Sequence, residues 1–421
     1  MRPSLATAAR DWARIGLLSF GGPAAQIALM HRIVVEERQW LTERQFLDAL
    51  SFCMVLPGPE AMQLATYAGW RLHGVRGGLM AGLLFVIPGA LVVLVLATIY
   101  VLYGDVPLVE AVFLGIKAAV LVIVIEALLR VARRALLRPL HWGLAAASFI
   151  AIFLLALPYP LVIATAALIG ALAGGAERAD AAPPLSVTPG QTLGTVATWL
   201  AIWLVPLLAL DLALPGSVLG ELGRFFSVLA TVTFGGAYAV LAFMAQDAVT
   251  GYGWLSAGEM MDGLGLAETT PGPLILVTEF VGFLAAARSG GEVNLAMGLA
   301  GALVTLWVTF APCFLWIFAG APYIDWIGTR PRLRAAMAGI TAAVVGVILN
   351  LSIWFALHVL FATVTRETAG PLTLWMPDIS TFDWRVVVIA GVAALLLLRL
   401  HRSVALTLGV CAGSGLLLSI F

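Results

Sequence analysis

Two short glycine- and proline-rich motifs stand inside apolar segments in the first half of the chain. They are Gly21-Gly22, which precedes a proline, and Pro57-Gly58-Pro59. Proline removes a backbone donor and clashes with a continuing helix, and glycine adopts conformations that a helix does not use. Each motif should therefore end one half-helix and start another, whose N-terminus carries partial positive charge. This arrangement favours an anion at the helix N-termini, and kinks that let helices pack closely are the structural alternative.

The same motifs return in the second half of the chain. Gly235 and Gly236 lie in a copy of the first motif, and Gly272 is the glycine of a second Pro-Gly-Pro. Thr269 and Thr270 precede this second Pro-Gly-Pro, and their hydroxyls are able to donate to an oxyanion. If the two halves are inverted, four helix N-termini would meet near the middle of the membrane. Such a cradle would suit a small dianion without a buried arginine.

Several acidic residues lie next to these motifs or inside apolar segments. Glu60 stands in the first turn after the first Pro-Gly-Pro, and Gln63 lies one turn further on. A carboxylate there either caps the helix or acts as a protonatable gate, because an ionised Glu60 would compete with an anion. Asp48, Glu268 and Glu279 are further candidates for coupling, since acids inside membrane segments are functional candidates by default. A capping or interfacial role remains open for Asp48.

Lys117 is the only lysine of the chain. It lies ten residues after Pro107, about 15 Å into a helix that rises about 1.5 Å per residue, and so deep in the membrane. A buried lysine requires an anion or an acid. Lys117 is therefore either a substrate or coupling group, or the partner of an acid from another helix. Glu126 more simply pairs with Arg130, four residues further on.

Arg32 belongs to a polar loop at the end of the first apolar segment. An arginine in a vestibule can gather anions, whereas a solvated loop of mixed charge is the simpler interpretation for its neighbours. The sequence shows no Ser/His/Asp or Cys/His constellation, no nucleotide site and no metal-ligand spacing. We therefore expect neither an enzyme nor a cofactor or metal. An intramembrane enzyme or sensor is the alternative from a different class.

The composition decides the class of protein. Hydrophobic residues make up 62% of the 421 residues and charged residues 11%, and Lys+Arg and Asp+Glu both number 23. A soluble domain is about 45–50% apolar and about 25% charged, so we expect an all-α polytopic protein in a lipid bilayer, with no nucleic-acid partner. Because about 20 apolar residues cross the hydrocarbon core, the chain divides into about 13 segments. These are 12–35, 45–70, 77–103, 107–132, 141–157, 160–174, 194–213, 224–246, 255–287, 293–321, 333–363, 384–399 and 403–421.

The chain repeats itself along its length. Trp40 matches Trp254 at an offset of 214 residues, which is also the offset between the two copies of each motif. A collinear series of such matches indicates an internal duplication. We expect a first repeat at 1–174, a Pro- and Gly-rich linker at 175–192, and a second repeat at 193–421 with an extra leading helix.

The two copies should have opposite orientations in the membrane. The equivalent segments 12–35 and 224–246 are the first and the eighth, and an odd separation inverts the second copy. Arginines gather at 130–138 and 330–334, which this topology places on the cytoplasmic side with the N-terminus, while the C-terminus lies outside. Inverted repeats are typical of secondary transporters with a site near the membrane midplane. A duplicated bundle without transport activity is the alternative.

Two stretches of sequence carry a resemblance to a known family. They are Phe20-Gly-Gly-Pro-Ala-Ala-Gln-Ile-Ala-Leu-Met-His31 and Leu56-Pro-Gly-Pro-Glu-Ala-Met-Gln-Leu-Ala-Thr-Tyr67, with copies near 233–236 and 270–273. The chain resembles the chromate ion transporter family in its long, two-domain form, over essentially its whole length. In the second copy Ala237 replaces the proline after the glycine pair, so the resemblance does not imply equal roles for the two cradles.

The resemblance implies export of chromate from the cytoplasm through the inner membrane, which confers chromate resistance. Sulfate is a nearly isosteric tetrahedral dianion, so a carrier of sulfate or another oxyanion, or an importer, is the alternative. A homo-oligomer is compatible with this interpretation.

Overall fold

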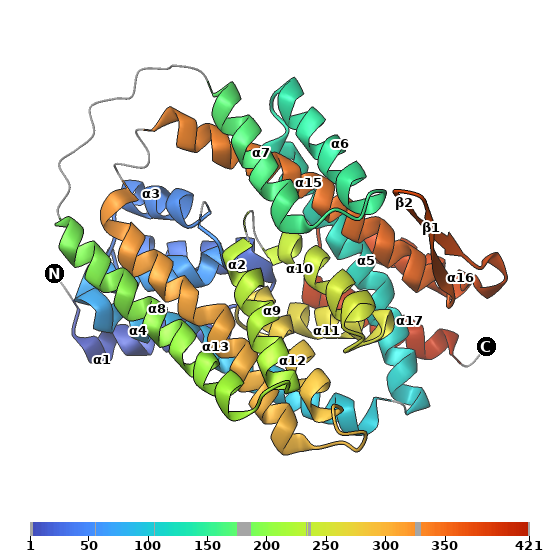
Figure 1. Cartoon of the computed structure of the whole chain (residues 1–421). Helices are drawn as coiled ribbons and strands as arrows, with labels where there is room; N and C mark the ends of the chain where they lie inside the picture. The colour runs from blue at the N-terminus through green and yellow to red at the C-terminus, as the bar shows by residue number, and fades with distance from the viewer. Residues whose placement is uncertain are drawn as a thin grey trace. The chain divides into compact units, whose positions relative to one another are not determined.

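The computed structural model describes residues 3–54, 56–104, 106–174, 187–232, 234, 237–324 and 330–419 (Figure 1). The predicted anion-cradle residues Gly235 and Gly236, and most of the predicted linker, lie outside the described residues. The chain forms two compact units, and each takes residues from both halves of the sequence. Unit 1 comprises Met1–Val101, Arg178–Ala237 and Leu266–Arg330. Unit 2 comprises Leu102–Glu177, Tyr238–Gly265 and Pro331–Phe421.

Unit 1 is built of helices. Its long helix α13 packs against α8, α9 and α12 (Figure 1). The elements are α1 (Leu5–Leu18), α2 (Gly22–His31), the π-helix η1 (Arg32–Glu37), α3 (Glu43–Cys53), most of α4 (Glu60–Tyr103), α8 (Pro189–Ala213), α9 (Val218–Val232), η3 (Leu274–Leu276), α12 (Val277–Ala287), α13 (Leu295–Gly320) and η4 (Ala321–Tyr323).

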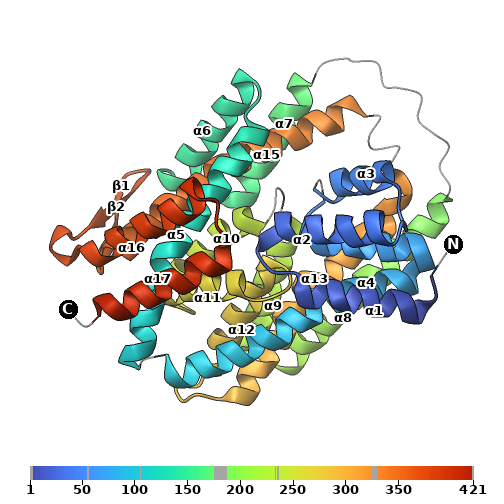
Figure 2. The same cartoon turned by 180° about the vertical axis from the view of Figure 1, so that it is seen from behind.

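Helices α15 and α5 make the main packing contacts of unit 2. Helices α5, α6 and α7 pack against α15, and α16 and α17 pack against α5 (Figure 2). The elements are α5 (Pro107–Ala135), α6 (Pro139–Phe153), α7 (Tyr159–Ala173), α10 (Ala237–Gln246), the π-helix η2 (Asp247–Gly251), most of α11 (Ala257–Thr269), α15 (Pro331–Leu360), β1 (Val364–Ala369), β2 (Leu372–Pro377), η5 (Ile379–Thr381), α16 (Trp384–Ala394), η6 (Leu395–Arg399) and α17 (Val404–Leu418).

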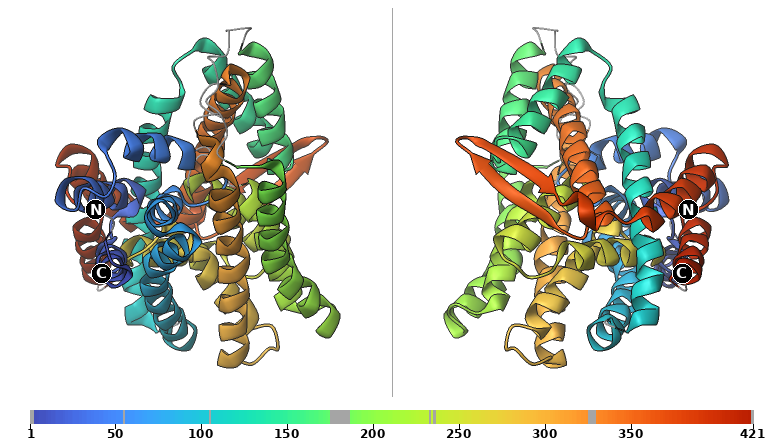
Figure 3. Two further views of the ribbon diagram at one scale, coloured as in Figure 1. Left: turned by 90° about the vertical axis from the view of Figure 1, so that its left-hand side faces the viewer. Right: turned by 90° about the vertical axis from the view of Figure 1, so that its right-hand side faces the viewer.

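The helical content and the apolar helices agree with the predicted all-α membrane protein. Five helices of the described chain are long and apolar enough to cross a membrane, namely Glu60–Tyr103, Pro107–Ala135, Pro189–Ala213, Leu295–Tyr323 and Pro331–Leu360. Shorter apolar helices accompany them, and the expectation of about 13 crossings stays a prediction. An antiparallel hairpin, β1–β2, follows α15 where no strand was predicted (Figure 3).

The helices are interrupted at the predicted glycines of the first half. Helix α1 ends at Leu18 and α2 begins at Gly22, while α3 ends at Cys53 and α4 begins at Glu60. Positive φ angles of 84° at Gly21, 77° at Gly22 and 118° at Gly58 lie in the region that favours glycine. The glycines are therefore required by the backbone conformation of the breaks themselves.

Equivalent positions of the two halves have the same local structure. Helix α2, the π-helix η1 and α3 have counterparts in α10, the π-helix η2 and α11 near the predicted offset. Thr42 and Gln45 form a reciprocal capping box at the start of α3, and Ser256 and Glu259 form the same box at the start of α11. The correspondence supports a duplicated sequence, and the opposite orientation of the copies remains a prediction.

Candidate functional site

Two of the predicted breaks meet in unit 1. The amide N–H of Gly272 donates to the Ser19 carbonyl over 2.9 Å. Buried Gln26 donates through Nε2 to the Gly272 carbonyl over 2.6 Å and to the Ser19 carbonyl over 3.3 Å. The Gly272 amide, predicted to donate to an anion, therefore serves a protein carbonyl in this conformation. Gln26 was missed as a site residue, although it lies within the motif that carried the family resemblance.

The break before α4 is held by a second buried glutamine. Gln63 Nε2 donates to the Pro57 carbonyl over 2.6 Å. A Cβ on Gly58 would lie 2.8 Å from Gln63 Nε2 and 2.9 Å from Cys313 Sγ. Pro59, at the end of the motif, accepts the backbone N–H of Gln63. Gly58 is thus needed for space as well as for its φ angle.

The two threonine hydroxyls that precede the second Pro-Gly-Pro motif donate to carbonyls at the end of α11. Thr269 Oγ1 donates to the Leu266 carbonyl over 2.8 Å, and Thr270 Oγ1 donates to the Ala267 carbonyl over 3.1 Å. Both therefore satisfy carbonyls at the C-terminal end of α11, where a helix leaves its last acceptors unpaired. In this conformation neither hydroxyl proton is directed to a ligand.

The acidic candidates occupy very different surroundings. Glu279, in the first turn of α12, is 1% exposed, and its Oε2 has no hydrogen-bond partner among the described residues. Glu268 is also buried, and a Cβ on Gly22 would lie 4.0 Å from its Oε2, so this carboxylate is near the N-terminus of α2. Glu60 is the first residue of α4 and is half-buried. Asp48, in contrast, is exposed and pairs with an arginine of its own helix.

The lysine of the chain lies against an acid of another helix. Lys117 Nζ on α5 is 3.2 Å from Asp262 Oδ2 on α11, and both residues belong to unit 2. Asp262 is almost completely buried, whereas the Lys117 side chain is 25% exposed. This is the second of the two roles considered for Lys117.

Glycines of α11 allow this ion pair to form. Gly258, Asp262 and Gly265 are spaced by four and three residues and so share one face of the helix. A Cβ on Gly258 would lie 3.1 Å from Lys117 Nζ, and one on Gly265 would collide with Ile116. The absence of side chains at both positions lets α5 and α11 approach closely around the ion pair.

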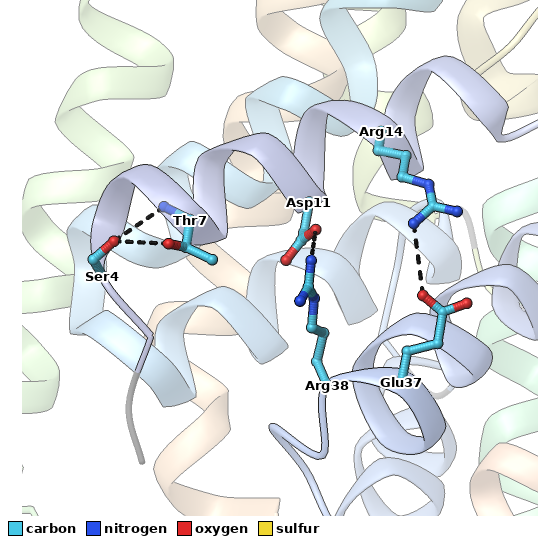
Figure 4. A network of polar contacts seen from close by, with 6 residues as sticks. All are labelled: Ser4, Thr7, Asp11, Arg14, Glu37 and Arg38. Carbon is cyan, nitrogen blue, oxygen red and sulfur yellow. Dashed lines mark hydrogen bonds and ion pairs between the residues drawn. The ribbon is translucent and has the colours of Figure 1, made fainter.

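The predicted polar loop forms the π-helix η1 and its C-cap Arg38, and its charged side chains contact those of α1 (Figure 4). Arg38 donates to buried Asp11 over 2.8 Å, and this bond raises the pKa of the Arg38 guanidinium above its usual value. Glu37 Oε2 lies 3.6 Å from Arg14 Nη1, and Glu37 Oε1 lies 3.6 Å from Arg32 Nε. Arg32 therefore pairs with Glu37 within an exposed network, and a role for Arg32 in gathering anions stays a prediction.

The described residues contain no group of three or more His, Cys, Asp or Glu side chains arranged to hold a metal ion. The polar groups described above are amides, hydroxyls, carboxylates, guanidinium groups and one ammonium group.

Comparison with known proteins places both halves of the chain in one family. The family model for the chromate transporter matches residues 6–171 and 220–416. A chromate transport protein of Pseudomonas aeruginosa is 33% identical over 366 residues, which cover 86% of this chain and 82% of that protein. A chromate transport protein of Cupriavidus metallidurans is 32% identical over 336 residues, 80% of this chain and 78% of that protein. A probable chromate transport protein of Synechococcus elongatus is 32% identical over 337 residues, 80% of each chain. No solved structure matches the chain.

Proposed function

The chain belongs to the chromate transporter family, and we propose that it is a secondary transporter that exports chromate through the inner membrane and so confers chromate resistance. The observation that carries this proposal is the match of both halves to proteins described as chromate transport proteins. The membrane-length helices suit a multi-pass protein of that kind. In our proposal the N-terminus is cytoplasmic, the C-terminus lies outside, and the two repeats are inverted.

In unit 2 we assign the dianion to Lys117. In the structure, Asp262 supplies the counter-charge of the partly exposed Lys117 ammonium group. An arriving chromate would take over that role and release Asp262, so Lys117 would keep a counter-charge in both states. Because Asp262 is almost completely buried, its carboxylate would take up a proton when chromate displaces it, since an unpaired buried charge would otherwise oppose the exchange.

In unit 1 we assign the helix N-termini of α2 and α4 as anion-binding elements. Their amide groups and dipoles favour negative charge, as the sequence predicts for the breaks at Gly22 and Gly58. Glu268 lies near the first of these termini and Glu60 begins the second. Protonation of either carboxylate would remove a competitor for the anion, which makes Glu60, Glu268 and buried Glu279 the coupling candidates.

Lys117 offers a direct test, because no other lysine is present to react with an amine reagent. Purified protein with its N-terminal amine blocked is labelled by an amine-reactive ester with increasing chromate, and the modification of Lys117 is followed by mass spectrometry. Chromate should slow the labelling in a saturable manner, and Lys117→Arg should remove the signal. Sulfate is run in parallel, and stronger protection by sulfate would favour the sulfate carrier. Labelling that is unchanged at every chromate concentration would remove Lys117 from the proposed site.

A further inference from the structure

Unit 2 contains a cavity of about 390 Å³ that the proposed chromate pathway does not use. Its walls come from the turn between α6 and α7, from η2 with the end of α10, from α15 and from the β1–β2 hairpin. Phe243 stacks on Tyr159 along one wall, with ring centroids 5.4 Å apart. The hairpin is fixed beside the cavity because the Thr373 amide donates to the Leu154 carbonyl over 2.7 Å.

Two buried polar side chains that line the cavity have atoms without partners in the described chain. Tyr159 is 3% exposed and its Oη has no hydrogen-bond partner, and Asn350 is 1% exposed and its Oδ1 has none. The Asn350 Nδ2 group lies 3.5 Å from Gln246 Oε1. The Asn350 Nδ2 group therefore serves Gln246, while Asn350 Oδ1 has no donor among the described residues. Buried polar atoms of this kind require a ligand or water.

A carboxylate borders the same cavity. Asp247 begins η2, and no basic side chain of the described chain forms an ion pair with it. Thr250 also lines the cavity, and its hydroxyl donates to the Gln246 backbone carbonyl over 2.6 Å, which leaves its oxygen lone pairs as acceptors. The cavity is therefore bordered by a carboxylate, an amide oxygen, a hydroxyl and a phenol. Oxygen atoms of these types are the ligands that hard cations prefer.

The single carboxylate of the cavity favours a monovalent cation over a divalent one. Asp247 is the one carboxylate among the residues that line the cavity. Arg366, on exposed β1, borders it as well, with its guanidinium carbon 5.8 Å from the centre of the Trp375 ring. Divalent ions are usually held by more than one carboxylate. A multiply charged oxyanion would meet the Asp247 carboxylate inside a largely apolar wall.

We propose that this cavity binds a hydrated monovalent alkali cation, Na⁺, through Asp247, Asn350, Thr250 and Tyr159. The cavity volume corresponds to about 13 water molecules at about 30 Å³ each, so the ion keeps part of its hydration shell. The site is separate from the Lys117–Asp262 pair. Its occupation is measured without chromate, so it can fail or succeed independently of the proposed transport.

Thermal unfolding of the purified, full-length protein tests the site. Unfolding midpoints are compared in NaCl and in choline chloride at equal ionic strength, over a range of Na⁺ concentrations. The wild type should unfold at a higher temperature in NaCl, with a saturable dependence on Na⁺. Asp247→Asn keeps the side-chain shape and should weaken the apparent Na⁺ affinity about tenfold or more, because it removes the charged ligand. Glu292→Gln, at an exposed acid outside the cavity, is the control and should respond like the wild type.

Two further variants test the site if Asp247→Asn does not fold. Thr250→Val, at an exposed position, should also weaken the Na⁺ response, and Arg366→Gln should strengthen it by removing a repelling charge. Equal midpoints in NaCl and choline chloride would overturn the proposal. Stronger stabilisation by Ca²⁺ than by Na⁺ would overturn the monovalent assignment. Stabilisation by sodium sulfate that is lost in Arg366→Gln, with none from NaCl, would make the cavity an oxyanion site and reject the cation.

Discussion

Lys117 Nζ of α5 lies 3.2 Å from Asp262 Oδ2 of α11, and the two residues are 145 positions apart in the sequence. Asp262 is the counter-charge of the Lys117 ammonium group within the protein. In the proposed site, chromate would replace Asp262 as this counter-charge. A side chain that is a quarter exposed can change partners with less reorganisation than a fully enclosed one.

Single and double substitutions separate transport from folding at this pair. Lys117→Met leaves the Asp262 carboxylate buried without its cation, so both the unfolding temperature and chromate transport should fall. The destabilisation should stay below the roughly 3–5 kcal/mol of a fully buried pair, because Lys117 is partly exposed. Adding Asp262→Asn removes the uncompensated charge.

The double variant Lys117→Met with Asp262→Asn should therefore regain thermal stability and still fail to transport. Unfolding midpoints and vesicle uptake, measured on the same preparations, decide between the two roles. Recovery of transport together with stability would show that the pair is structural and that chromate binds elsewhere.

The Pro-Gly-Pro break before α4 should be intolerant of a side chain at its glycine. Gly58→Ala adds a Cβ at a φ of 118° and within 3.0 Å of two side-chain atoms, so it should destabilise the fold by about 1–3 kcal/mol or more. Gly74→Ala is the matched control, since Gly74 also has a positive φ but nothing lies within 4 Å of its Cβ. Thermal unfolding should show a clearly larger loss for Gly58→Ala, and equal losses would mean that packing around Gly58 is unimportant.

Gln26 should hold together the two breaks of unit 1. Gln26→Leu removes the donor to the Gly272 carbonyl and leaves that buried acceptor unsatisfied, which costs about 1–3 kcal/mol. Gln45→Leu is the same substitution in the solvent-accessible capping box of α3. It removes the acceptor of the Thr42 amide and should cost less. Unfolding midpoints of the two variants provide the comparison. A loss for Gln26→Leu no greater than that for Gln45→Leu contradicts the role assigned to Gln26.

The inverted topology predicts that two arginine-rich stretches share one side of the membrane. Single cysteines at 130–138 and 330–334 in a cysteine-free background should both be labelled from the cytoplasmic side. The native cysteines, Cys53, Cys313 and Cys411, are all buried and unpaired, so each is to be replaced by a small residue. Labelling of the two stretches from opposite sides would rule out the inversion.

The sequence revealed the features that depend on neighbouring residues. Proline and glycine fix local backbone geometry, so the breaks at Gly22 and Gly58 were predictable. The Glu126–Arg130 pair, at 2.5 Å, follows from helix spacing alone. The kink at His73–Gly74 divides α4 between two predicted segments.

Features that depend on tertiary packing were not predictable in this way. The partner of Lys117 was left open because no local pattern selects Asp262 from the other buried acids. The bond from Gln26 to Gly272 spans 246 positions, so no local signal announces it. The burial of Glu279 and the exposure of Asp48 likewise follow from helix packing. The β1–β2 hairpin has strands of six residues with mixed polar and apolar character, so no long apolar segment marks it.

Transport by the purified protein in sealed vesicles tests chromate export and the role of Lys117 in one experiment. The protein is reconstituted in inside-out orientation, and uptake of labelled chromate and labelled sulfate is followed with and without a pH gradient. Chromate uptake should be saturable in the wild type and absent in the Lys117→Met, Asp262→Asn double variant of restored stability. Vesicles that accumulate sulfate but no chromate, or a double variant that transports chromate like the wild type, would contradict these proposals.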